Sequence, residues 1–361
     1  MLNGFRIIEF EGIGPGPFAA MMLADLGAEV IVIQRPNSAN PTVGDHNLLD
    51  RGKRAIILDL KNGGDLTVAR ALIQSSDALI EGNRPGVMER LGLGPAECLK
   101  AHPNLVYGRM TGWGQAGPRA MQAGHDYNYI ATSGALWYAS QPGQAPQTPA
   151  TLVGDIGGGA LYLVAGILAG LLNAQKTGEG TVVDAAIVDG SAHMMALLMS
   201  MAPGGNLVKP RGQSLLDGPH WSRVYQCADG QYLSVQCLEA KFYTEFLRIL
   251  GLRDDPRFAV QYDPEKWAAQ TAELKRLFAS RPLQHWAELF DGTDACVAPV
   301  LAPEDAASDP HMAARGVWHQ GPLQPAPAPR FDGETQAPNP IPERGADGEA
   351  MRAELQAKGL L

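Results

Sequence analysis

Two ionisable side chains beside glycines are the residues of this sequence best suited to chemistry. His125 lies in GHDYNY at 124–129, and Asp155 lies in GDIGGG at 154–159. A histidine and an aspartate that face each other across a cleft can exchange a proton near neutral pH, because their surroundings tune their pKa values. The glycines after Asp155 let a ligand approach the backbone, and at a helix start they leave N–H groups free to hold negative charge. The competing interpretation is a structural histidine and an N-capping aspartate.

A second group of residues could bind an anion. Between residues 31 and 61 there are five Lys or Arg and three Asp, in a chain whose net charge is −9. Arginine meets phosphate oxygens through two parallel hydrogen bonds, which lysine cannot do. The sequence by itself leaves an anion site and a solvated surface as equal alternatives. The basic residues that we consider for such a site, in this region and after it, are Arg35, Arg51, Lys53, Arg54, Lys61, Arg84, Arg90 and Arg109.

Composition narrows the class of protein. The chain of 361 residues is long enough for two domains, and 45% hydrophobic with 19% charged residues is ordinary for a soluble globular protein. The net charge of −9 argues against general nucleic-acid binding. The four cysteines, at 98, 227, 237 and 296, include no C-x-x-C pair, which argues against a zinc site or a disulfide framework. We therefore expect no metal and a reducing, cytoplasmic compartment.

Membrane insertion and secretion are not expected. The N-terminus lacks a basic region followed by an apolar run, so it does not resemble a signal peptide. The longest apolar run, 156–172, is at the short edge of a membrane span and contains five glycines. A buried helix packed closely on its neighbours is the expectation.

The elements around these residues alternate between strand and helix. A strand at 6–10, a glycine turn, a helix at 18–26 and a strand at 30–33 form a βαβ unit. The turn departs from the dinucleotide fingerprint, because its sixth position is Pro17 and Gln34 stands where an acid would hold the ribose, and both departures argue against NAD. We predict an α/β fold with a Rossmann-like parallel sheet. Further strands are expected at 55–60, 78–80, 105–110 and 181–186, with helices at 66–75, 87–91, 156–174 and 188–201.

Two domains are expected. The large Rossmann-like domain covers 1–203 and is completed by 321–361, while 204–320 forms a smaller α+β domain with its linkers. In the small domain, the pattern predicts a hairpin from 223–227 and 232–237, followed by helices at 242–250, 268–280 and 283–290. The helix at 188–201 is rich in methionine, which is more often core than ligand surface.

Several motifs together resemble those of a known family. They are DLK at 59–61, EGNRPGV at 81–87, RMTGWGQAGP at 109–118, GHDYNY at 124–129, GDIGGG at 154–159 and VDAA at 183–186. With these motifs the sequence is similar to the family III CoA-transferases, also called the CaiB/BaiF family, over almost its whole length, and within that family to the branch of the α-methylacyl-CoA racemases. The departures from that branch, among them Gln34 and Ala240, concern the acyl group more than the proton chemistry.

The resemblance implies roles for three residues. In the transferases the residue matching Asp155 is the nucleophile that becomes an aspartyl-CoA thioester, whereas the racemase branch adds residues matching His125 and Glu239. This chain has all three, which favours racemisation of 2-methylacyl-CoA thioesters through an enolate flanked by His125 and Asp155, with Glu239 orienting the imidazole. CoA transfer on Asp155 is the alternative, and a non-catalytic CoA-binding protein or an NAD-dependent protein is the third.

The resemblance also implies the ligand and the assembly. An acyl-CoA is the substrate, and no cofactor beyond its CoA moiety is needed. Two chains interlock as a homodimer in which Glu239 of one chain reaches His125 of the other. Arg35 would lie against the adenine, and the phosphates would face Arg51, Arg54, Lys61, Arg84 and Arg109.

Overall fold

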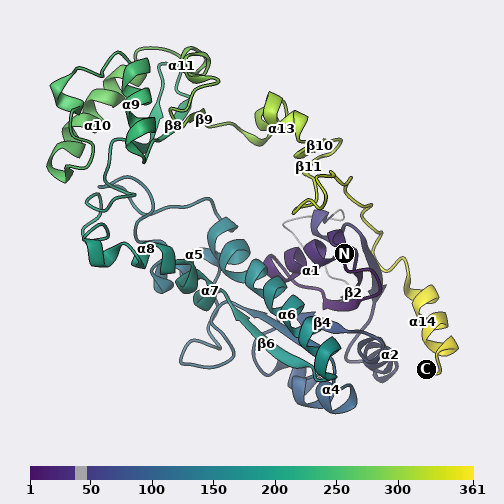
Figure 1. Cartoon of the computed structure of the whole chain (residues 1–361). Coiled ribbons are helices and arrows are strands. Elements are labelled where there is room, and N and C mark those ends of the chain that lie inside the picture. The colour runs from purple at the N-terminus through teal and green to yellow at the C-terminus, as the bar shows by residue number, and fades with distance from the viewer. Residues whose placement is uncertain (37–46) are drawn as a thin grey trace. The chain divides into compact units, whose positions relative to one another are not determined.

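The computed structural model describes residues 1–36 and 47–361, which divide into two compact units. The first unit contains residues 1–136, 148–195 and 313–361, and the second contains 137–147 and 196–312. Figure 1 shows the chain running from the first unit into the second and returning at its C-terminal end. Each unit has its own hydrophobic core and is described by itself.

A six-stranded parallel sheet forms the centre of the first unit. Its strand order is β3-β2-β1-β4-β5-β6, which is the order of doubly wound dinucleotide-binding folds. The α/β class and the parallel Rossmann-like sheet expected from the sequence are therefore confirmed. The strands are β1 (Arg6–Phe10), β2 (Glu29–Gln34), β3 (Lys53–Ile57), β4 (Ala78–Glu81), β5 (Val106–Thr111) and β6 (Thr181–Ala186).

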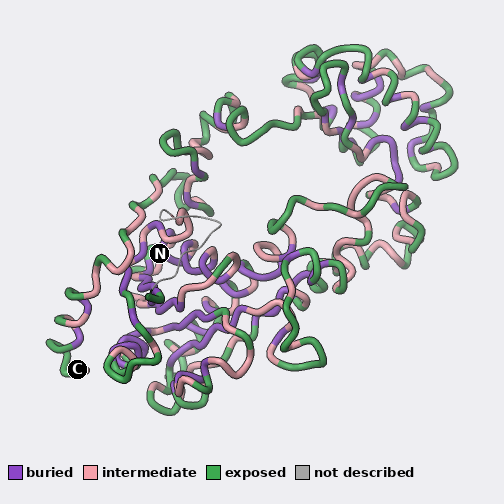
Figure 2. The backbone as a smooth tube through the Cα atoms, turned by 180° about the vertical axis from the view of Figure 1, so that it is seen from behind, coloured by how far each residue is buried: buried purple, intermediate pink, exposed green. Residues whose placement is uncertain are grey.

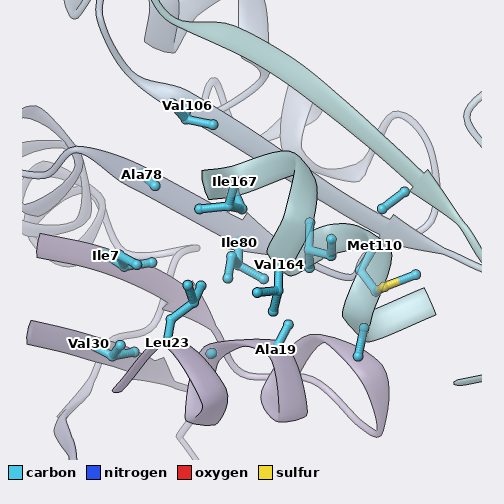
Figure 3. Close-up of a cluster of buried hydrophobic side chains, with 14 of the residues drawn as sticks. Ile7, Ala19, Leu23, Val30, Ala78, Ile80, Val106, Met110, Val164 and Ile167 are labelled. Atoms are coloured by element: carbon cyan, nitrogen blue, oxygen red, sulfur yellow. The ribbon is translucent and has the colours of Figure 1, made fainter. Parts of the chain in front are cut away.

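Helices cover both faces of this sheet, because alternate residues of each central strand are apolar on opposite faces. Ile7 packs with one face and Ile8 with the other. Figure 3 shows the first face, where Leu23 of α1 (Pro15–Asp25) and Val164 and Ile167 of α6 (Leu161–Thr177) meet the strands. The second face is covered by α2 (Gly63–Gln74), α4 (Pro95–Ala101) and α14 (Gly348–Ala357).

The remaining elements of the first unit are short or lie near the sheet ends. They are η1 (Leu48–Asp50), α3 (Val87–Arg90), α5 (Asp126–Ser133), the π-helical segment η2 (Leu152–Ala160), α7 (Ile187–Met194), β10 (Trp318–Gln320) and β11 (Leu323–Pro325). The helix α13 (Pro310–Ala314) lies at the boundary of the two units.

The C-terminal segment returns to the edge of the sheet at β3. The N–H of Gly52 donates to the carbonyl of Pro340, and Ala55 and Asp347 exchange two hydrogen bonds through the Asp347 backbone and side chain. This pairing occupies polar groups of an edge strand that would otherwise be open to other chains. The segment ends in α14, which Figure 1 draws in yellow and which contacts both β3 and α2.

The second unit is a small α+β arrangement. Its antiparallel sheet has the order β7-β8-β9, built from β7 (Ser222–Gln226), β8 (Tyr232–Gln236) and β9 (Val297–Pro299). Its aromatic core joins this sheet to α9 (Ala240–Ile249), α10 (Pro264–Phe278) and α11 (Leu283–Phe290). Its other elements are α8 (Ala196–Met199), η3 (Ala202–Gly204), η4 (Pro256–Phe258) and α12 (Pro303–Ala306). Figure 2 shows the buried segments of both units in purple.

The structure departs from the predicted elements at several places. The helix expected at 156–174 begins earlier and opens with the π-helical η2, while the helix expected at 188–201 is broken between α7 and α8. Helices α4 and α5 and strand β9 were not predicted. By length and composition Leu152–Thr177 could cross a membrane, but Leu163, Val164 and Ile167 are buried against the sheet, as expected for a core helix.

Candidate functional site

A cleft opens at the carboxyl ends of β1, β4 and β5. Its volume is about 300 Å³. It lies where β1 and β4 are neighbours in the sheet, and the chain that follows β1 continues to one side of the sheet while the chain that follows β4 continues to the other. Ligands of open α/β sheets bind at such a switch point. Its lining comes from the ends of four strands and from the elements beyond them: residues 10–17 at the end of β1, Arg35 after β2, Ile80, Gly82 and Asn83 at the end of β4, residues 110–112 at the end of β5, Gly124, His125 and Tyr129 around the start of α5, Asp155 of η2 and Ile187 of α7.

Asp155 is half-buried and lies inside η2 rather than before a helix. A Cβ atom on Gly14 would come within 3.6 Å of the Asp155 Oδ2 atom, so the carboxylate lies against the glycine turn that follows β1. Burial raises the pKa of Asp155 to about 6; the negative charge of Asp126 adds to this rise, and His125 opposes it. Asp155 can therefore both hold and release a proton near neutral pH. A π-helical turn is rare and often marks a functional site.

Asp126 holds the turn that carries Asp155. Its Oδ1 accepts the N–H of Asp155 at 2.9 Å, and its Oδ2 accepts the N–H of Thr151 at 3.1 Å. Thr151 has a φ of 66°, a left-handed conformation that is unusual for this residue type. Asp126 is only 5% exposed, and a Cβ on Gly154 would overlap its carboxylate, so glycine is required there. Sequence reasoning missed Asp126, although its position next to His125 was a signal.

His125 enters the same cleft from the start of α5. It is the N-cap residue of that helix, and its backbone N–H donates to the Oδ1 of Asn128 at 2.9 Å. The residue is exposed, and its charge acts on the Asp155 carboxyl. The structure thus brings the two acid–base candidates of the sequence to one cleft.

Aromatic packing fixes the wall beside His125. The rings of Tyr129 and Trp113 meet edge to face with centroids 4.8 Å apart, and the Tyr129 hydroxyl donates to the carbonyl of Gly124. A Cβ on Gly112 would overlap the Tyr129 ring. Gly112 of the motif at 109–118 and Gly124 of the motif at 124–129 are therefore needed so that the aromatic pair can pack against the backbone.

The N–H groups next to Asp155 are already occupied. The Asp155 N–H donates to Asp126 and the Ile156 N–H donates to the carbonyl of Thr151 at 3.0 Å. These two groups therefore do not supply the anion-holding donors expected near Asp155 and its glycines. The first N–H groups of α5, on Asp126 and Tyr127, have no acceptor within the helix, because they belong to its first turn.

A second and larger pocket, of about 530 Å³, adjoins this cleft. The two share Phe10, Glu11, Arg35 and Asn83, so they form one continuous path from Asp155 to the ends of β2 and β3. Three basic residues line the second pocket: Arg35, Lys61 and Arg90. Arg90 lies on α3; it is one of the basic residues of the sequence but was not among the expected CoA contacts.

Arg35 and Arg84 both follow strands that end at this path. The Arg35 side chain is 64% exposed and lines both pockets. Arg84 is exposed, and its charge acts on the Tyr129 hydroxyl by lowering a pKa that burial raises. The Arg35 guanidinium donates from Nη2 to the carbonyl oxygen of Glu11 at 3.1 Å, and the exposure of both side chains allows them to turn toward an anionic ligand.

The other three predicted phosphate contacts have carboxylate partners instead. Arg51 is 2% exposed and pairs with Asp25 at 2.6 Å, so its guanidinium is part of the protein interior. Arg109 is 7% exposed and pairs with Glu81 and Glu89. Arg54 joins a partly buried network that reaches α14. The expectation that these residues face phosphates is corrected: each guanidinium offsets carboxylates that would otherwise be unpaired.

Glu239 belongs to the second unit. It is exposed at the N-terminal end of α9. Burial raises the pKa values of Tyr262 and Cys296, and the negative charge of Glu239 adds to both rises. The site built in the first unit thus contains His125 and Asp155 but not Glu239. Among the described residues, no cluster of three His, Cys, Asp or Glu side chains is arranged to hold a metal ion.

Known proteins resemble this chain over most of its length. Residues 2–348 match the family model of CoA-transferase family III. The α-methylacyl-CoA racemase of Mus musculus is 39% identical over 332 residues, which cover 91% of this chain and 85% of the relative. The acetyl-CoA:oxalate CoA-transferase of Acetobacter aceti is 29% identical over 378 residues, which cover 98% of this chain and 96% of the relative.

The fold agrees with this assignment. The crystal structure of a CaiB/BaiF family protein from Brucella suis has a TM-score of 0.81 at 27% identity and covers 98% of both chains. The chain belongs to CoA-transferase family III.

Proposed function

We propose that this protein racemises 2-methylacyl-CoA thioesters at C2. The observation that carries the proposal is the presence of His125 and Asp155 in one cleft that continues into a pocket lined by basic residues. The relative from Mus musculus that bears the name α-methylacyl-CoA racemase supports it. The proposed acid–base residues are His125 and Asp155, with Glu239 as an orienting carboxylate.

The chemistry needs two proton carriers on opposite faces of one carbon. The hydrogen at C2 of a thioester is weakly acidic, and its removal leaves a planar enolate. If Asp155 removes the proton, a protonated His125 returns one to the other face, and the substrate of opposite hand reverses these roles. Each positioned acid or base contributes a factor of about 10² to 10⁴ in rate. The raised pKa of Asp155, about 6, suits a group that must act in both directions.

The enolate oxygen needs hydrogen-bond donors. We place it at the start of α5, where the N–H groups of Asp126 and Tyr127 have no acceptor within the helix and the helix dipole favours negative charge. These donors come directly after His125 in the chain, so the same turn positions both the imidazole and the oxyanion site. Donors held rigidly where charge develops stabilise the transition state more than the ground state.

The CoA moiety would occupy the larger pocket. Arg35 and Lys61 line it, and the exposed Arg84 directly follows Asn83, which lines both pockets, so the adenosine phosphates and the pyrophosphate would meet guanidinium and ammonium groups there. The pantetheine arm would then run along the residues shared by the two pockets, Phe10 and Asn83, toward Asp155. Beyond the CoA moiety the proposed reaction needs no cofactor.

The proposed assembly is a homodimer in which Glu239 of one chain completes the site of the other, interlocked as the family resemblance implies. A carboxylate beside His125 would orient the ring and favour its charged form. The four cysteines are free thiols, which suits the proposed cytoplasmic location.

Deuterium exchange tests the proposal directly. In heavy water, the enzyme should introduce deuterium at C2 of a 2-methylacyl-CoA and scramble the configuration at that carbon, as followed by NMR and chiral chromatography. His125→Ala and Asp155→Ala should each lower the rate by about 10²-fold or more, while Asp189→Ala, on the exposed side of α7, should leave it unchanged. Wild-type protein that binds the thioester but exchanges no deuterium at any pH would exclude racemisation.

CoA transfer is the second candidate, because Asp155 is a partly accessible carboxylate in the cleft and a relative is named as a CoA-transferase. In that reaction the Asp155 carboxylate attacks the thioester carbonyl and expels CoA as a thiolate. The thiolate then attacks the aspartyl carbonyl of the resulting anhydride, which releases the donor carboxylate and leaves an aspartyl-CoA thioester, and an acceptor carboxylate takes the CoA by the reverse of these two steps. Hydroxylamine trapping of Asp155 after mixing with acyl-CoA, read by mass spectrometry, would reveal this route. Deuterium exchange at C2 without a trapped adduct would argue for racemisation instead.

A further inference from the structure

The C-terminal segment reaches the junction of the two pockets. Arg344 Nη1 pairs with Glu11 Oε1 at 2.6 Å, and Arg344 Nη2 donates to the carbonyl oxygen of Arg35 at 3.0 Å. The next residue, Gly345, donates its N–H to Oε1 of the buried Gln34 at 2.9 Å. Gln34 stands where dinucleotide-binding folds carry an acid that binds the ribose. Here its side chain instead holds the C-terminal segment.

Glu11 stands between two guanidinium groups. Its Oε2 accepts the backbone N–H of Arg35 at 2.8 Å and lies 3.9 Å from the Arg35 Nε, while its Oε1 faces Arg344. The Glu11 side chain is 15% exposed, against 64% for Arg35 and 31% for Arg344. Because Glu11 lines both pockets, its charge is presented to any ligand that occupies them.

An unpaired carboxylate at this place would oppose an anionic ligand. A second carboxylate nearby, Glu9, forms a fully buried ion pair with Lys53. The charge of Lys53 is therefore already offset and does not neutralise Glu11. Arg344 makes the closer ion pair with Glu11, at 2.6 Å, while the Arg35 Nε lies 3.9 Å from the carboxylate and the Arg35 Nη2 donates to the Glu11 carbonyl oxygen at 3.1 Å. Without Arg344, the Glu11 carboxylate would be left to Arg35 alone, and the exposed Arg35 side chain would be held on Glu11 more tightly and away from the ligand.

We propose that Arg344 is a positioning residue for the nucleotide end of the ligand: by neutralising Glu11, it leaves the guanidinium of Arg35 available to the anionic, adenosine-bearing part of a CoA thioester. The proposal rests on the proposed function for the identity of the ligand. It assigns to the C-terminal segment a role in binding that none of the sequence motifs indicates, since Arg344 and Glu11 are 333 positions apart.

The same segment offers a matched control. Arg352, on α14, pairs with Asp65 at 2.8 Å and is 40% exposed, and it lines neither pocket. Both arginines attach the C-terminal segment to the sheet unit through an ion pair with a carboxylate. A loss of CoA affinity that arises from weaker attachment of the segment should therefore appear in both Arg344→Ala and Arg352→Ala. A loss of CoA affinity that arises through Glu11 should appear only in Arg344→Ala.

Calorimetric titration with free coenzyme A tests the proposal without any need for turnover. Arg344→Ala should weaken CoA binding about 5- to 30-fold, the size expected for one charge interaction at a partly buried site. Arg352→Ala should bind as the wild type does, and Arg344→Lys should retain most of the affinity. In the double variant Glu11→Gln/Arg344→Ala, affinity should return to within about 3-fold of Glu11→Gln alone, because no carboxylate is left to neutralise.

The possible outcomes distinguish the role of Arg344 from the proposed function. Wild-type protein that does not bind CoA would overturn the proposed function. CoA binding by the wild type with an unchanged affinity in Arg344→Ala would overturn only the role of Arg344. That role would also be overturned if the loss of CoA affinity caused by Arg344→Ala persisted in full in the Glu11→Gln background, or if Arg352→Ala lost the same affinity. In exchange assays, Arg344→Ala should raise KM for the thioester and leave kcat within about 2-fold, since the groups at C2 are untouched.

Discussion

Asp155 shows how neighbouring residues set the proton affinity of one carboxyl group. Burial makes the charged form costly, the charge of Asp126 makes it more so, and His125 partly offsets both. The result is a pKa of about 6, so both the protonated and the ionised carboxyl group are populated at slightly acidic to neutral pH. Asp126 thus has two effects at once: its hydrogen bonds to the Asp155 and Thr151 N–H groups fix the turn, and its charge raises the pKa of Asp155.

The effect of the Asp126 charge can be tested with Asp126→Asn, which removes the charge and keeps an acceptor oxygen for one of the two N–H groups. When Asp155 is the base it must be ionised, so kcat/KM should fall as the pH drops below about 6. Removal of the Asp126 charge lowers the pKa of Asp155, and this fall in rate should then move to lower pH. The pH profile of deuterium exchange at C2 measures the shift. Asp189→Asn, on an exposed face of α7, is the control, and an acidic limb that stays in place in Asp126→Asn would contradict the role given to the Asp126 charge.

The carboxyl group can also be observed without catalysis. Infrared titration of Asp155 in the unliganded protein should show its pKa nearer the ordinary aspartate value in Asp126→Asn than in the wild type. A variant that has lost its fold would instead lose the cooperative thermal transition, so a melting curve distinguishes the two cases.

At the scale of elements, the position of Asp155 depends on close contact between η2 and α7. A Cβ on Gly190 would overlap the carbonyl oxygen of Gly158, and a Cβ on Gly158 would overlap the hydroxyl of the buried Ser191. Two backbones that approach so closely leave no space for side chains. The glycines after Asp155 therefore serve packing as well as ligand access.

Gly190→Ala should therefore be destabilising. We expect a loss of about 1–3 kcal/mol in the free energy of unfolding, because the new methyl group meets backbone rather than a flexible side chain. Gly63→Ala is the matched control: it lies at the first position of α2 with open space around its Cβ, and it should be neutral or slightly stabilising. Urea unfolding measures both, and equal stability of the two variants would show that η2 and α7 adjust without cost.

At the scale of the whole molecule, the residues proposed for acid–base chemistry and the carboxylate proposed to orient His125 belong to different units. His125 lies in the first unit and Glu239 in the second. If each site takes its small unit from the partner chain, as we propose, then two inactive variants can restore one another. A hybrid of His125→Ala and Glu239→Ala chains has one site with both substitutions and one site with neither.

Co-refolding these two variants in equal amounts should therefore recover about a quarter of the wild-type exchange rate, since half of the dimers are hybrids with one intact site each. Each variant refolded alone should stay inactive. Refolding of His125→Ala with Asp155→Ala is the control, because both substitutions fall in the first unit and no hybrid site is intact. Hybrids that form, as shown by native mass spectrometry, and that remain inactive would place Glu239 in the site of its own chain.

The sequence by itself determined the class of fold and the two central residues. Alternate apolar residues such as Ile7 and Ile8 pack on opposite faces of the sheet, and this pattern is local, so strands and their parallel arrangement could be predicted from short windows. His125 and Asp155 were recognisable because glycines beside them mark places where the backbone must be approached closely. The C-terminal ends of strands then indicated where a ligand would lie.

Only the tertiary structure decided which charged groups are free. Arg51, Arg54 and Arg109 look like Arg35 in the sequence, but distant carboxylates neutralise them and leave Arg35 at the pocket. The attachment of Arg344 to Glu11 and of Asp126 to the turn of Asp155 likewise joins segments that are far apart along the chain. Hydrophobic periodicity acts over a few residues, whereas the partner of a charge is chosen by whichever segment the folded chain brings beside it.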